Sequence, residues 1–227
     1  MKAIFTVLVA FFCLSCSSIF RPYPCGPVLD KEEIQVFKRQ NEFLGLKPGV
    51  VFADIGASSG YYDAAMAVFL DSVTFYLNDI DQHCLNERNL NKVLRYYSKL
   101  KGSSIQTTNS FHLIIGTPTR TNLPENTFDV IFSNATMHVI DQPDSILTDL
   151  YRNLKTDGSI YIRDEFVYNG ELKKCGSKKC GHYVLQYEPF IKRMNRNGFV
   201  LSGETRELGY PIYKFSKALT RQESNSN

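Results

Sequence analysis

The pattern of apolar and polar positions predicts an early strand, turn and helix unit. Apolar residues recur at helical intervals over residues 30–44, which predicts a first helix. A continuous apolar run over residues 50–55 then predicts a strand that is buried on both faces. It leads into a glycine-rich turn at residues 56–60 and a second helical pattern over residues 61–70. This order is the usual opening of a nucleotide-binding α/β unit.

Short apolar runs continue to alternate with helical patterns toward the C-terminus. Further strands are predicted over residues 73–77, 111–115, 128–133, 159–162, 199–202 and 211–215. Helical periodicity separates several of them, as over residues 144–154 and 188–197. Regular alternation of this kind predicts an α/β fold with a parallel sheet that is covered by helices on both faces.

The N-terminal segment differs from the rest of the chain. A positive start at Met1-Lys2 precedes the apolar residues 3–14 and the small polar residues around Cys16, which is the layout of an export signal. About a dozen apolar residues fall short of the roughly 20 that a spanning helix needs, so cleavage is favoured. The surroundings of Cys16 resemble the lipobox of bacterial lipoproteins, with plain secretion or a retained anchor as alternatives.

Length and composition set limits on the protein class. The 227 residues suit one domain of about 200 residues with an appendage. We expect a signal peptide over 1–15, a lipidated Cys16 and proline-rich linker over 16–29, a folded domain over 30–217 and a disordered tail over 218–227. The 43% hydrophobic and 22% charged residues exclude a disordered or multi-span protein. A formal charge of +3, with scattered basic residues, does not favour a nucleic-acid partner.

The glycine-rich turn narrows the choice of ligand. It reads Gly-Ala-Ser-Ser-Gly over residues 56–60, which is neither the dinucleotide fingerprint nor a phosphate-binding loop. Asp79 follows the second strand, where this architecture places a carboxylate that accepts ribose hydroxyls. The turn therefore does not provide for the pyrophosphate of a dinucleotide, and a P-loop is excluded.

Four stretches resemble the motifs of class I S-adenosylmethionine-dependent methyltransferases. They are residues 54–61 (first motif), 78–81 (second motif), 123–131 (approach to the fourth strand) and 154–159 (turn before the fifth strand). The resemblance covers residues 30–217. It implies a Rossmann-like, doubly wound, mostly parallel seven-stranded sheet, S-adenosylmethionine as cofactor, and methyl transfer to a small-molecule or protein acceptor.

The resemblance also implies a set of cofactor contacts. Asp54 would lie near the methionine amine, Asp79 would accept the ribose hydroxyls, and Thr117 would meet the adenine edge. The full expected set is Asp54, Gly56, Ala57, Ser58, Gly60, Asp79, Ile80, Thr117 and Ser133. Ser58 stands where the family usually has glycine. His138, after the fourth strand, is the candidate general base or substrate contact, against the alternative that it only orders its loop.

The cysteines need separate interpretations. Cys175, Cys180 and His182 form a C-x4-C-x-H cluster for which metal binding, a thiol site for a soft substrate such as trivalent arsenic, and a local disulfide compete. Export would favour the disulfide, so no metal is expected. Cys84 is expected as a core-facing thiol and Cys25 as a linker residue.

Two further points stay open. Tyr97 and Lys101 have the spacing of the catalytic pair of short-chain dehydrogenases, but they precede the third strand, so we interpret the match as coincidence. S-adenosylmethionine is a cytoplasmic cofactor, whereas the N-terminus indicates export. The favoured hypothesis is a membrane-anchored methyltransferase on the outer side, with a cytoplasm-facing anchor as alternative. A non-catalytic methyltransferase-like binding module is the second hypothesis.

Overall fold

The computed structural model describes residues 25–176 and 180–218. The expected signal peptide, Cys16 and all but the first residue of the expected tail lie outside these ranges. Within them, no helix is both long enough and apolar enough to cross a bilayer.

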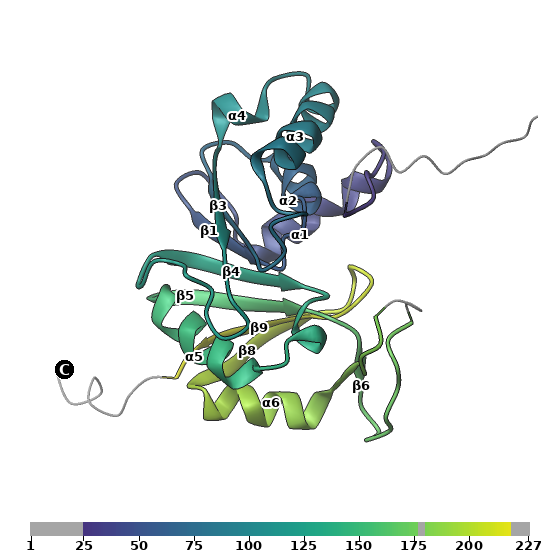
Figure 1. Cartoon of the computed structure of the whole chain (residues 1–227), viewed down its shortest axis with the longest axis vertical. Helices are drawn as coiled ribbons and strands as arrows, with labels where there is room; N and C mark the ends of the chain where they lie inside the picture. Colours follow the sequence, from purple (N-terminus) through teal and green to yellow (C-terminus); the bar gives the residue numbers. More distant parts are fainter. Residues whose placement is uncertain (1–24, 177–179, 219–227) are drawn as a thin grey trace, which may run out of the picture.

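A seven-stranded sheet with the order β3-β2-β1-β4-β5-β9-β8 forms the centre of the protein (Figure 1). The strands are β1 (Val51–Ile55), β2 (Thr74–Asp79), β3 (Ser110–Ile115), β4 (Phe128–Asn134), β5 (Leu154–Arg163), β8 (Phe199–Thr205) and β9 (Ile212–Lys217). Strand β9 runs antiparallel to β5 and β8, and the other neighbouring strands are parallel. A separate parallel pair joins β6 (Phe166–Val167) to β7 (Leu185–Gln186). The expected doubly wound, mostly parallel seven-stranded fold is confirmed.

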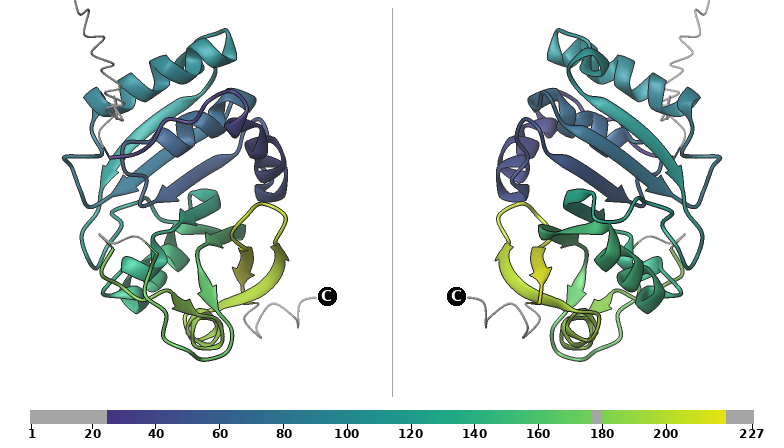
Figure 2. Two further views of the ribbon diagram at one scale, coloured as in Figure 1. Left: turned by 90° about the vertical axis from the view of Figure 1, so that its right-hand side faces the viewer. Right: turned by 90° about the vertical axis from the view of Figure 1, so that its left-hand side faces the viewer.

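Helices cover both faces of this sheet (Figures 1 and 2). They are η1 (Glu33–Gln35), α1 (Val36–Leu44), α2 (Tyr61–Met66), η2 (Ala67–Phe69), α3 (Glu87–Lys101), α4 (Ile105–Thr108), η3 (Met137–Val139), α5 (Pro143–Asn153) and α6 (Tyr187–Arg196). Their apolar positions meet the sheet in two buried clusters, one with α1, α2 and α3 and one with α5 and α6.

Successive residues of the central strands enter opposite clusters. Phe52 of β1 and Phe132 of β4 are fully buried in the first cluster. Their neighbours Ala53 and Ile131 are fully buried in the second. Because side chains alternate across a strand, a continuous apolar run can serve two cores at once. The uninterrupted apolar pattern over residues 50–55 therefore agrees with the central parallel strand that the structure shows.

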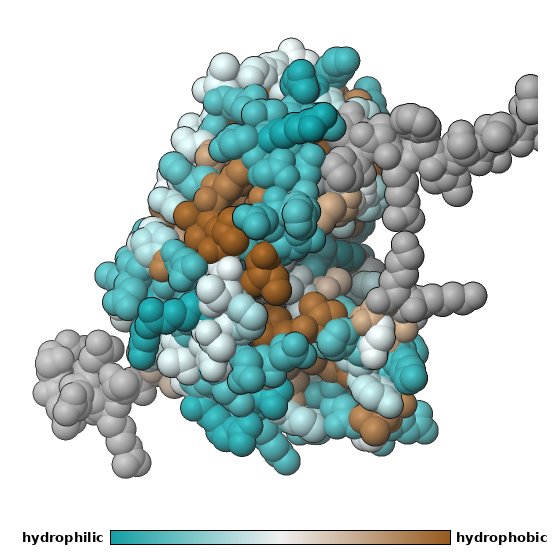
Figure 3. All heavy atoms as spheres, viewed as in Figure 1, coloured by the Kyte–Doolittle hydropathy of each residue, from teal (hydrophilic) through white to brown (hydrophobic). Residues whose placement is uncertain are grey.

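The surface is predominantly hydrophilic on the side seen in Figure 3. There, apolar residues form a broken band across the middle, with hydrophilic residues around it (Figure 3). Among the described residues, the exposed large apolar side chains include Ile80, Ile115 and Val139.

The end of the expected linker is bonded to the fold. Cys25 forms a disulfide with Cys84, so Cys84 is not the free core-facing thiol that we expected. The hydroxyl of Ser58 donates a hydrogen bond to the Cys25 carbonyl. Sequence position could not reveal this pairing, because the turn after β2 and the segment before η1 meet only when the sheet has formed.

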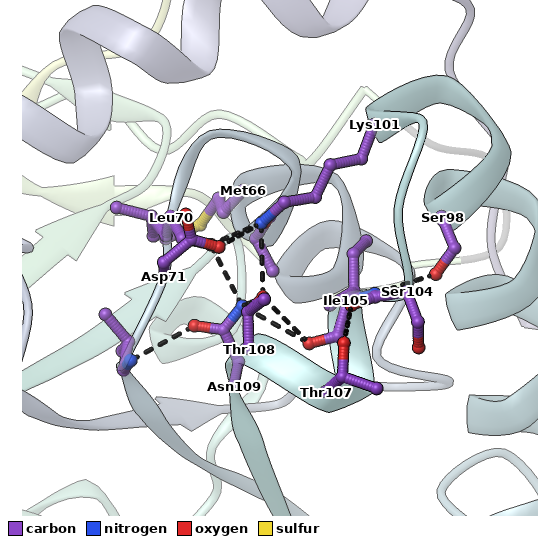
Figure 4. Close-up of polar contacts among 12 residues, drawn as sticks. Met66, Leu70, Asp71, Ser98, Lys101, Ser104, Ile105, Thr107, Thr108 and Asn109 are labelled. Carbon is purple, nitrogen blue, oxygen red and sulfur yellow. Dashed lines mark hydrogen bonds and ion pairs between the residues drawn. The ribbon is translucent and has the colours of Figure 1, made fainter.

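Lys101 at the end of α3 has a structural role (Figure 4). Its Nζ donates to the carbonyl oxygen of Leu70 at 2.7 Å and to Asp71 Oδ1 at 2.6 Å. The Tyr97 hydroxyl is directed elsewhere and accepts a hydrogen bond from the Leu29 amide at 2.9 Å. The different partners of the two side chains support the interpretation of the Tyr97 and Lys101 spacing as coincidence.

Candidate active site

The glycine-rich turn after β1 is held closely against its neighbours. Gly56 has a φ of 84°, and a Cβ there would lie 2.1 Å from Thr136 Oγ1. A Cβ on Gly60, with a φ of 75°, would lie 2.8 Å from the Leu77 and Leu90 methyl groups. Both positions therefore need glycine for conformation and for space. The amides of Gly56 and Ala57 donate to the Asn78 carbonyl at the end of β2 at 2.8 and 3.0 Å.

Ser58 occupies the middle position of the glycine-rich turn, where the resembling motif has glycine. Its φ of 55° lies in the left-handed region, which a serine adopts at some cost. Two hydrogen bonds hold it there: its amide donates to Asp79 Oδ2 at 2.7 Å, and its hydroxyl donates to the Cys25 carbonyl. The side chain thus provides a contact to the N-terminal segment that glycine could not make.

Asp79 is placed to accept hydrogen bonds from a ligand. Its Oδ2 accepts from the Ser58 amide and its Oδ1 from the Asp81 amide at 2.9 Å. A carboxylate oxygen has two lone pairs, so each keeps one acceptor position. Since Asp79 lines a pocket, these positions suit the two ribose hydroxyls of a nucleoside.

That pocket, of about 270 Å³, opens at the carboxyl ends of the parallel strands. Among the expected contact residues, its wall contains Gly56, Asp79, Ile80 and Thr117. The Ile80 side chain is 61% exposed, which leaves an apolar surface on which a planar base can pack. The crevice outside these strand ends is where open α/β sheets bind their ligands.

Other expected residues lie behind the pocket wall. Asp54, Ala57, Ser58, Gly60 and Ser133 do not line the pocket. The Ser133 side chain is fully buried and its hydroxyl has no hydrogen-bond partner. These residues can shape the turn, but they are not placed to contact a ligand in the pocket directly.

Several residues that line the pocket were missed by sequence reasoning. Asn78 donates through Nδ2 to the carbonyls of Ile114 and Thr121, at 3.1 and 2.7 Å, and so joins β2 to β3 and to the segment that follows β3. Thr121 and Thr136 line the same pocket. Asn78 had a usable signal, because it directly precedes Asp79 in the second motif, and Thr136 lies in the stretch after the fourth strand that also contains His138.

Asp54 at the end of β1 forms a buried acidic pair with Asp63 of α2. The two residues are 2% and 0% exposed. Burial, and then the charge of Asp63, raise the pKa of Asp54 well above its usual range. Burial raises the pKa of Asp63 to about 7. Since like charges cannot both be ionised cheaply in a dry interior, the pair retains a proton near neutral pH. Asp63 was not identified from the sequence.

His138 in η3 has its ring oriented by a buried carboxylate. Its Nδ1 lies 2.8 Å from Asp164 Oδ1, and the Asp164 side chain is 1% exposed. This hydrogen bond raises the pKa of His138. The contact assigns the proton to Nδ1 in the neutral ring and leaves Nε2 with its lone pair. His138 lies directly before Val139, which lines the pocket.

The two cysteines of the C-x4-C-x-H cluster are free thiols, so the favoured local disulfide is wrong. The Cys175 amide instead donates to the His182 carbonyl at 2.9 Å across a short antiparallel turn. This turn brings both Sγ atoms within 4.8 Å of each other and of a ring nitrogen of His138. His182 is not part of this group. The histidine close to the two cysteines is His138, which precedes them in the sequence by more than 30 residues.

Comparisons with known proteins identify the fold and the domain. Residues 53–162 match the family model described as "Methyltransferase domain". No match was found among the curated proteins. A SAM-dependent methyltransferase from Aquifex aeolicus is 16% identical, with a TM-score of 0.57 over 84% of this chain and 100% of that chain.

Two other solved structures share the same fold. The 1,6-didemethyltoxoflavin-N1-methyltransferase of Burkholderia thailandensis, solved with bound 1,6-didemethyltoxoflavin and S-adenosylhomocysteine, is 15% identical, with a TM-score of 0.57 over 84% of this chain and 80% of its own. The [4+2]-cyclase SpnF is 14% identical, with a TM-score of 0.64 over 87% of this chain and 90% of its own. The mostly parallel seven-stranded sheet with helices on both faces matches the fold of these methyltransferases.

Proposed function

We propose that this chain, a methyltransferase by its domain over residues 53–162, transfers the methyl group of its cofactor S-adenosylmethionine to a small-molecule or protein acceptor. Asp79 carries the proposal. Its carboxylate is fixed by two backbone amides beside the glycine-rich turn, faces the pocket and retains acceptor positions for ribose hydroxyls.

The remaining wall suits the rest of such a nucleoside. Ile80 offers an apolar surface for adenine, and Thr117 lies in the same pocket for the adenine edge. The turn over residues 56–60 lacks side chains that would block a flat approach, apart from Ser58, which is bonded to the Cys25 carbonyl. Asp54 is buried behind this turn and does not line the pocket, so it can support the turn but is not assigned a contact with the ligand.

Methyl transfer from a sulfonium needs little from a protein beyond alignment and exclusion of water, because the leaving group is neutral. The acceptor would enter on the side of the pocket formed by Thr136 and Val139. His138 lies between these two residues, so we assign it to the acceptor side of the site.

Titration calorimetry of the full chain tests this proposal. S-adenosylmethionine and S-adenosylhomocysteine should both bind, and Asp79→Ala should weaken both by about 10-fold or more, as expected for about 1.4 kcal/mol or more from two hydrogen bonds to a charged group. Asp81→Ala is the matched control, because its carboxylate is exposed and bonds only to the His83 amide. Absence of heat with either ligand would leave a non-catalytic binding module as the better account.

We also propose that Cys16 carries a lipid that anchors the domain at the outer side of a membrane. The Cys25 and Cys84 disulfide supports an oxidising compartment, since such bonds are rare in the cytosol. Labelling with palmitate should mark the wild-type chain and not Cys16→Ala. Label that persists in Cys16→Ala would refute this site.

A further inference from the structure

We propose that His138, Cys175 and Cys180 bind one Zn²⁺ ion beside the cofactor pocket. One ring nitrogen and two Sγ atoms of these residues lie within 4.8 Å of one another. In a tetrahedral zinc site, ligand atoms stand about 3.5–3.8 Å apart, given Zn–S near 2.3 Å and Zn–N near 2.0 Å. Movements of roughly one ångström would therefore close the three ligands around an ion.

The ring of His138 is held by Asp164 in an orientation that suits a metal ligand. Asp164 holds Nδ1 at 2.8 Å, and its other oxygen accepts the His138 backbone amide at 3.3 Å. Zinc-binding histidines usually donate their second ring nitrogen to a carboxylate, which fixes the ring and increases the basicity of the metal-binding nitrogen. The Asp164 contact at Nδ1 leaves Nε2 as the ring nitrogen that can bind a metal.

The cysteines reach the histidine through a short antiparallel turn. Its two sides are joined by the Cys175 amide bonding to the His182 carbonyl and by the Val184 amide bonding to the Lys173 carbonyl, both at 2.9 Å. Both thiols are half-buried and unpaired with other cysteines. Binding would replace their two protons, released to solvent, by two sulfur–zinc bonds. Thiolate and imidazole ligands together favour zinc over hard cations.

Among the described residues, the group contains three side chains, so a fourth position stays open for water or another ligand. Three protein ligands and an open position are typical of catalytic rather than structural zinc. His138 lies between Thr136 and Val139 of the pocket wall, so an ion here would be near the entering acceptor. If the proposed methyl transfer is correct, the ion suits an acceptor with a thiol or hydroxyl group, whose proton it would acidify.

Metal binding can be tested without any activity measurement. The full chain, reduced, loaded with Zn²⁺ and dialysed, should retain about one zinc per chain by elemental mass spectrometry. Cys175→Ser, Cys180→Ser and His138→Ala should each lose it, while the neighbouring control His182→Ala should keep it. Asp164→Asn should keep the stoichiometry but weaken affinity by about 10–100-fold.

Cobalt provides a signature that a purely structural role would not give. Co²⁺ loaded into the wild-type chain should show thiolate charge-transfer and intense tetrahedral d–d absorption, both lost in the cysteine variants. Zinc loss in His182→Ala equal to that in the cysteine variants would overturn the proposed ligand set. Failure of the folded wild-type chain to bind zinc, or a Cys175 and Cys180 disulfide in freshly isolated protein that resists metal loading, would overturn the site.

Discussion

Asp54 at the end of β1 and Asp63 in α2 are two interacting carboxyl groups that are both buried inside the fold. Burial raises the pKa of both residues, that of Asp63 to about 7. Their raised pKa values make the pair a source of pH-dependent stability.

The free energy of unfolding should fall as pH rises from roughly 4 to 7. Unfolded aspartates ionise near a pKa of about 3.9, so the folded state binds more protons than the unfolded state in this window. One such carboxyl changes stability by at most about 1.4 kcal/mol per pH unit. Urea unfolding across this range should show the decline, and Asp63→Asn should flatten it. An unchanged slope in Asp63→Asn, equal to that of the exposed control Asp81→Asn, would contradict this origin.

Gly56→Ala should damage the cofactor turn more than glycine-to-alanine changes elsewhere. A Cβ at this position would meet Thr136 Oγ1 at 2.1 Å, in addition to the strain of a positive φ. Gly170→Ala is the control, because Gly170 has a similar φ of 76° and open space around its Cβ position. We expect Gly170→Ala to cost about 1 kcal/mol and Gly56→Ala a further 1–3 kcal/mol or so from overpacking. Denaturant unfolding of both variants, with calorimetric cofactor binding, measures the difference, and equal costs would argue against the close contact.

Loss of the Cys25 and Cys84 disulfide should destabilise the fold by about 2–4 kcal/mol, because the bond closes a loop across a sequence separation of 59 residues. Cys84→Ser should therefore melt below the wild-type chain. Reductant should lower the wild-type melting temperature toward that of Cys84→Ser and leave the variant unchanged. A reductant effect of equal size in both proteins would show that another bond is responsible.

Lys101→Met should lower stability by about 1–2 kcal/mol, since it removes a charged donor from the half-buried Leu70 carbonyl and from Asp71. Lys99→Met on the same helix is the matched control, because Lys99 is exposed. Thermal unfolding should separate the two variants. Similar melting temperatures would mean that solvent replaces the contacts of Lys101 without loss.

The sequence by itself determined the fold and part of the wall of the proposed cofactor pocket. Continuous apolar runs such as residues 50–55 and the acidic residue after β2 are local signals, because burial on both faces and position at a strand end depend on neighbouring residues in the chain. Gly56, Asp79, Ile80 and Thr117 were expected at the site from the resemblance of the sequence motifs, and all four line the pocket.

Only the tertiary structure decided the pairings between distant segments. Cys84 forms a disulfide with Cys25, and Asp63 interacts with Asp54. His138 is hydrogen-bonded to Asp164 and lies close to Cys175 and Cys180. Each contact joins elements that become neighbours only through the order of the strands and the packing of the helices on the sheet. Local periodicity carries no information on such distances, so the C-x4-C-x-H spacing could not show that the fold brings His138, and not His182, close to Cys175 and Cys180.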